Sequence, residues 1–143
     1  MNNLGKLVTR IGLISLFSVM PLAAQVAYGV KFTAPFPFYV GNTQMPSGSY
    51  SLTQPDDLFN KIVQVKSEDG LHSAYINVIP TESLEPPRQS KVVFERYGDT
   101  LYFDRVILQG DPDGIAAEST KAEKKAKETA SVVEERSVAV AGQ

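Results

Sequence analysis

The stretch from Val30 to Leu52, VKFTAPFPFYVGNTQMPSGSYSL, decides the fold of this chain. Up to Val40, apolar residues occupy every second position, with Lys, Thr, Pro or Tyr between them. Successive side chains of a β-strand point to opposite faces, so this alternation predicts a strand with one face in a core. Pro35 and Pro37 fall on the outward positions and cannot donate ladder hydrogen bonds, which predicts an edge strand or a bent one.

The strand is followed by residues that favour turns. Gly41, Pro46 and Gly48 supply fixed or positive φ, and we expect them to act as structural turn residues. Alternation resumes at Tyr50 and Leu52, which predicts a second strand. The opening stretch therefore predicts the first two strands of an antiparallel fold.

The same alternation recurs further along the chain. Residues 59–67 and 71–80 read as strands joined at a hairpin turn, SEDG, which ends at Gly70. Residues 91–108 read as a second hairpin that turns at Gly98 and Asp99, and we expect Gly98 to adopt positive φ. The sequence thus predicts a mostly β fold, a small antiparallel sandwich or barrel of about six or seven strands.

The composition changes after Gly114. Residues 115–143 are rich in Ala, Lys and Glu, which favour helix, and Thr120 with Glu123 has the spacing of a capping box. The expected apolar stripe is mostly alanine and buries little area; its residues are Ala122, Ala126, Ala130 and Val133. We therefore predict a β domain over residues 25–114 and a weakly docked, helical or disordered tail over 115–143 with a frayed end.

The first 24 residues have the layout of a secretory signal peptide. Lys6 and Arg10 precede an apolar run, Ile11 to Ala24, that ends in small residues and is shorter than a membrane span. We expect cleavage after Ala24, with Gly29 as the alternative; an uncleaved anchor and a buried N-terminal helix are the competing interpretations. The sequence predicts export to the periplasm or the extracellular space, with no stable membrane span after cleavage.

Composition excludes several classes of chemistry. The chain has 143 residues, a net charge of -2, one histidine and no cysteine. Disulfides, thiolate metal sites and cysteine nucleophiles are therefore excluded, and the concentrated basic footprint of a nucleic-acid binder is missing. One domain of this length can bury a core without disulfides.

No motif predicts catalytic, cofactor-binding or metal-binding residues. His72 has no partner evident in the sequence and reads as a core or surface residue rather than a catalytic one. Asp111-Pro112-Asp113-Gly114 resembles the start of a calcium loop, but Ile115 and Ala122 stand where ligands belong, so a turn is favoured. Asp56-Asp57 reads as a loop or cap, and Lys121–Lys127 as a solvated helix face rather than a binder of anionic surfaces. The hydroxyls of Ser47, Ser49 and Ser51 lack a nucleophile elbow.

Two segments together resemble a family of small exported bacterial proteins of unknown function. The resemblance rests on a PF-x-F-x-V-G…P-x-G-x-Y opening and an F-x-R-Y-G hairpin. It implies export and no activity, substrate or catalytic residue. The segment PSGSYSL is also similar to a turn and strand of prealbumin-like and immunoglobulin-like sandwiches. The residues that carry the family resemblance are Pro35, Phe36, Phe38, Val40, Gly41, Pro46, Gly48, Tyr50, Phe94, Arg96, Tyr97 and Gly98.

These observations favour an exported, non-enzymatic β module without a cofactor that binds or scaffolds an envelope or extracellular protein or glycan. The outward aromatics Tyr39 and Tyr102 are the candidate binding surface, because exposed aromatic side chains commonly anchor interfaces. The alternative is a carrier of a small apolar ligand, with the opening phenylalanines lining a cavity. A hydrolytic enzyme ranks below both.

Overall fold

The structure is a computed structural model that describes residues 29–54 and 61–141. It is mostly β, with one short helix and ten strands in one open, mixed sheet. The strands are β1 (Val30–Ala34), β2 (Phe38–Val40), β3 (Thr43–Met45), β4 (Gly48–Thr53), β5 (Ile62–Ser67), β6 (Ser73–Glu82), β7 (Lys91–Tyr97), β8 (Thr100–Ile107), β9 (Asp113–Ala117) and β10 (Val133–Ala139), and the helix is α1 (Lys121–Thr129).

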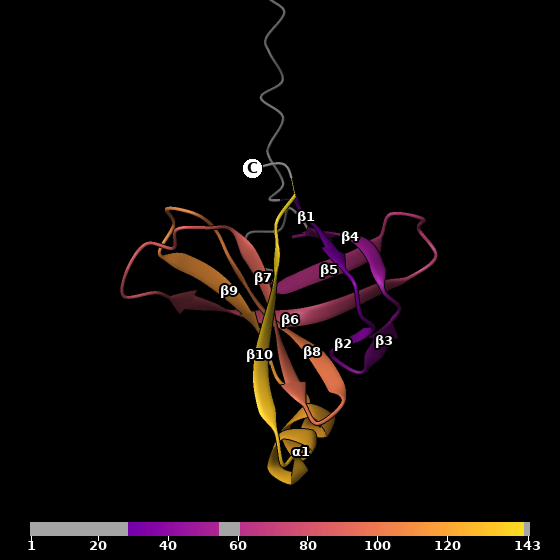
Figure 1. Cartoon of the computed structure of the whole chain (residues 1–143). Helices are drawn as coiled ribbons and strands as arrows, with labels where there is room; N and C mark the ends of the chain where they lie inside the picture. The colour runs from indigo at the N-terminus through magenta and orange to yellow at the C-terminus, as the bar shows by residue number, and fades with distance from the viewer. Residues whose placement is uncertain (1–28, 55–60, 142–143) are drawn as a thin grey trace, which may run out of the picture.

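The strand order is β1-β4-β5-β6-β9-β8-β2-β3, with β7 beside β8 and β10 beside β7. Every pairing is antiparallel except that of β2 with β8, where Tyr39 lies opposite Tyr102. In Figure 1, β10 runs the length of the molecule, from α1 at one end to β1 at the other. There a bridge between Phe32 and Val140 joins the two strands.

The predicted first strand is bent, as its prolines require. Residues 30–34 form β1, the chain bends over residues 35–37, and β2 follows. The turn region contains a further strand that the sequence did not reveal, β3, whose Met45 is fully buried. Tyr50 is also buried, and its hydroxyl donates to the Pro46 carbonyl. This contact gives the P-x-G-x-Y segment a structural role.

The core lies between the inner faces of the strands and is rich in aromatic side chains. Phe94 is fully buried and its ring contacts those of Phe32, Phe36, Phe38 and Phe103. Burial alternates along β5 and β6, whereas β7 and β8 also bury residues of their other face, among them Val93, Tyr97 and Tyr102. Buried on the inner faces are Val63, Val65, Ala74, Ile76, Val78, Val92, Leu101 and Phe103.

The prediction of positive φ at Gly98 is confirmed, with φ of 61°. Gly98 and Asp99 form a two-residue turn between β7 and β8, and only the first has positive φ, as in a type II′ turn. Arg96 Nε donates to the Gly98 carbonyl at 2.7 Å. Gly98 and Arg96 of the F-x-R-Y-G segment thus stabilise one tight turn.

The prediction of a separate, frayed tail is wrong. Residues 133–139 form β10, which pairs with all of β7, from Val133 opposite Tyr97 to Ala139 opposite Lys91. The strand count is also higher than predicted, and the β2–β8 pairing makes the sheet mixed. Helix is confirmed for residues 121–129, where Thr120 Oγ1 accepts from the Glu123 N–H at 3.2 Å.

Candidate functional site

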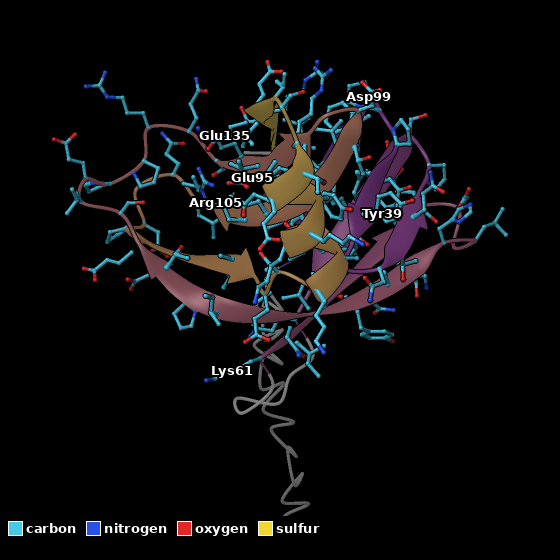
Figure 2. The ribbon with its side chains drawn as sticks, turned by 90° about the horizontal axis from the view of Figure 1, so that it is seen from below. Tyr39, Lys61, Glu95, Asp99, Arg105 and Glu135 are labelled. Atoms are coloured by element: carbon cyan, nitrogen blue, oxygen red, sulfur yellow. The ribbon has the colours of Figure 1, made fainter. Side chains whose placement is uncertain are left out.

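The two predicted surface tyrosines lie together on the outer side of the sheet. Their rings stack with centroids 5.4 Å apart, because β2 and β8 are neighbours. The prediction that both are exposed is wrong for Tyr102, which is 8% exposed, whereas Tyr39 is half-buried. The helix α1 crosses this face, with Tyr39 on one side of it and Glu95, Arg105 and Glu135 on the other (Figure 2).

Acidic side chains from neighbouring strands point to the same face. Glu95 lies opposite Tyr102 and accepts a hydrogen bond from the Tyr97 hydroxyl. A shift in the β7–β8 register between Val93 and Phe94 leaves Asp104 without a partner in the ladder, and its carboxylate contacts the Arg105 guanidinium. We call Tyr39, Tyr97, Tyr102, Glu95, Asp104 and Glu123 the tyrosine–carboxylate cluster.

Glu123 joins the cluster from α1. It is 4% exposed and is the buried residue of a helix whose lysines are exposed. Burial raises its pKa to about 7, and the negative charges of Asp104 and Glu95 act in the same direction. The Thr120 backbone N–H, which completes the capping box, and the charge of Lys127 oppose this rise only in part.

Carboxylates outnumber cations among the groups that act on Glu123 and Asp104. Glu135 of β10 adds a further carboxylate and binds Arg105 with an N–O distance of 2.8 Å. Burial also raises the pKa of Asp104, in spite of its contact with Arg105. Tyr97 and Tyr102 remain neutral, since burial raises the pKa values of both hydroxyls. The cluster can therefore take up and release a proton near neutral pH.

Sequence reasoning found the two tyrosines and missed the acidic part of the cluster. Glu123 was expected only to cap the helix, and Ala122 to lie on the buried stripe, but Ala122 is exposed. The capping-box spacing predicts that Glu123 lies in the first turn of the helix. Whether its side chain is buried depends on where α1 packs on the sheet. No sequence signal carries that information.

His72 is exposed and lies next to a hydrogen-bonded turn. The Ser67 hydroxyl donates to the Asp69 carboxylate and accepts from the His72 backbone N–H at 3.0 Å. The Asp69 pKa is lowered, mainly by the Ser67 hydrogen bond. A nucleophilic triad needs the histidine between serine and carboxylate. Here the serine binds the carboxylate directly, so these residues stabilise the β5–β6 connection.

The other predicted polar motifs have structural roles where the structure describes them. Asp111 accepts from the Asp113 N–H at 3.0 Å, the geometry of a turn. The Ser49 and Thr33 hydroxyls bond across β4 and β1. Within residues 29–54 and 61–141, no group of acidic or histidine side chains could hold a metal ion, and no helix has the length and apolarity to cross a membrane. The predicted signal segment and Asp56-Asp57 lie outside those residues.

An apolar cavity of about 170 Å³ opens at the other end of the sheet. Val30, Leu52, Val106 and Ile115 contribute apolar wall, and Asp111 and Asp113 also line it. The opening phenylalanines do not line this cavity; they pack against one another in the core.

Comparison with known proteins identifies no relative of this chain. No family model matches the sequence, and neither the curated proteins nor the solved structures contain a significant match.

Proposed function

We propose that this chain is an exported, non-enzymatic β module that binds a partner protein of the envelope or the extracellular space through the outer face of β6. The proposal rests on two exposed apolar side chains, Tyr75 and Ile79, which flank the exposed Asn77 on a strand whose opposite face forms the core. Tyr75 is 63% exposed and Ile79 is 43% exposed, while Ala74, Ile76 and Val78 between and beside them are buried.

The neighbouring strands extend this face. In the strand register, Gln64 lies opposite Tyr75, Ile62 opposite Asn77, and Ala116 opposite Ile79. An aromatic anchor with aliphatic and amide neighbours is typical of the centre of a protein interface. The filled aromatic core supports binding at the surface rather than inside the sheet.

The test is capture of a partner by the purified protein from envelope extract, followed by affinity measurement with the isolated partner. Tyr75→Ser combined with Ile79→Ser should weaken binding more than tenfold. The matched control is Leu84→Ser, which removes another fully exposed apolar side chain, outside β6, and should change binding less than threefold. Thermal unfolding of each variant verifies that it is folded. Binding that survives the double substitution would reject this face.

A carrier of a small apolar ligand is the second candidate, favoured by the cavity beside Val30 and Ile115. The Phe32–Val140 bridge supports interpreting the sheet as a partly closed barrel, with this cavity at one mouth. Its volume is close to that of cavities of about 150 Å³ that bind benzene. Benzene should therefore raise the melting temperature, and Ile115→Phe, which fills the space, should abolish the rise. An unchanged melting temperature in saturating benzene would reject the carrier.

A further inference from the structure

The helix α1 is attached to the sheet by few contacts. Its N-terminal cap lies near the β2–β3 turn, where Thr120 Cγ2 would be 3.7 Å from a Cβ on Gly41. Beyond its C-terminus, the Val132 carbonyl accepts from the Gly98 N–H at 3.0 Å. Between these ends Ala126 and Ala130 are half-buried and Glu123 is buried. Two alanines bury little apolar area. The protonation state of Glu123 therefore has a large effect on how strongly α1 is docked on the sheet.

The surroundings of Glu123 disfavour its charge. The acidic groups that face it are Glu95 on β7 and Asp104 on β8, with Glu135 on β10 acting on Asp104. Arg105 on β8 is bound to Asp104 and Glu135, and Lys127 is the cation of α1 that acts on Glu123. The remaining titratable groups that face Glu123 are Tyr97 and Tyr102, whose pKa values burial raises further above neutrality.

We propose that α1 is a pH-sensitive strap that covers Tyr102 and runs beside its stacking partner Tyr39, held against the sheet while Glu123 carries its proton and released when Glu123 ionises. Ionisation places a further negative charge among Glu95 and Asp104 in a site shielded from water. Lifting the helix returns that carboxylate to solvent. The same movement uncovers Tyr102, which turns a buried tyrosine pair into an accessible aromatic surface.

The direction of the effect follows from proton linkage. The pKa of Glu123 is about 7 with the helix docked, against its ordinary value of 4.5. Because the pKa is raised in the docked state, that state binds the Glu123 proton more tightly than the undocked state does. Docking is therefore strongest below pH 4.5 and is lost as the pH rises through about 7. Between about pH 5 and about pH 8 the full shift corresponds to about a seventyfold loss in the docking equilibrium. Structural relaxation around Glu123 makes this loss smaller, and we expect the docking equilibrium to fall at least about tenfold.

Hydrogen exchange of the α1 amides in the full-length chain measures this equilibrium directly. After correction for the intrinsic pH dependence of exchange, protection of these amides should be at least tenfold lower at pH 8 than at pH 5. Glu123→Gln keeps the shape of the side chain without its charge and should reduce this ratio to less than twofold. Glu128→Gln is the matched control, because it removes an exposed carboxylate from the same helix, and should keep the full ratio.

Two results would overturn the proposal in these experiments. One is equal protection of wild-type α1 at both pH values; the other is loss of the pH dependence in Glu128→Gln as well as in Glu123→Gln. If Glu123→Gln does not fold, the proposal is tested by NMR titration of the Glu123 carboxyl group in the wild-type protein. A titration midpoint of Glu123 near 7 supports the strap, and a midpoint near 4.5 rejects it.

Discussion

Phe94 is the position at which a single substitution should cost most. The side chain is fully buried. Its ring lies 5.1 Å from those of Phe36 and Phe38 in edge-to-face geometry, and 6.1 and 6.3 Å from those of Phe32 and Phe103. Because these rings come from three strands and the bend at residues 35–37, Phe94 connects segments that are distant in sequence.

The magnitude follows from the contacts. Phe94→Leu keeps most of the volume but loses the two close edge-to-face pairs, at about 0.5–1.5 kcal/mol each, so we expect a loss of about 2 kcal/mol. Phe94→Ala adds a cavity and should cost about 4 kcal/mol. Phe36→Leu should cost about 1 kcal/mol, because Phe36 is half-buried and contacts Phe94.

Equilibrium urea unfolding followed by circular dichroism measures these losses as shifts in midpoint at constant slope. The double variant Phe36→Leu/Phe94→Leu should lose about 1 kcal/mol less than the sum of the single variants, because the shared pair is lost once. If Phe94→Leu costs no more than Phe36→Leu, or if the two losses are additive, Phe94 is not the centre of the aromatic core.

Three further predictions concern the backbone and pH. Removing residues 133–143 should cost more than about 2 kcal/mol or abolish cooperative unfolding, since β7 loses its partner; an unchanged melting temperature would contradict the role of β10. Gly114→Ala should destabilise more than Gly98→Ala, because its Cβ would lie 2.8 Å from the Val106 carbonyl oxygen while Gly98 has free space and only φ strain of about 1 kcal/mol; the reverse order in thermal melts would refute this. Wild-type unfolding free energy should fall by about 1–3 kcal/mol between pH 4.5 and 7 relative to Glu123→Gln, in urea titrations at each pH, and parallel curves would reject the linkage.

The parts of the fold that were predictable are those encoded locally. Alternation in residues 30–40 assigns the right residues to the core, because strand periodicity is fixed by the backbone. The turn at Gly98 was predictable because few residues tolerate positive φ. The capping box of α1 follows from spacing alone.

The parts that were missed depend on partners distant in sequence. SVAVAGQ reads as a frayed end, yet Val138 becomes part of a strand because β7 has a free edge beside it. Val138 and Val140 alternate and pack against the core, but residues 133–137 before them are exposed and show no such alternation. The burial of Glu123 and of Tyr102 was missed for the same reason. Both depend on how α1 packs across strands that precede this helix in the chain.

Strand β10 extends the β7–β8 hairpin, which was predicted from the sequence. Val133 pairs with Tyr97, and Val140 forms a bridge with Phe32 near the start of the described chain. During synthesis from the N-terminus, β7 therefore keeps an unpaired edge until β10 has been made. Such an edge is a template for pairing with other chains. A chain cut short before β10 therefore exposes an aggregation-prone strand edge rather than merely losing a tail.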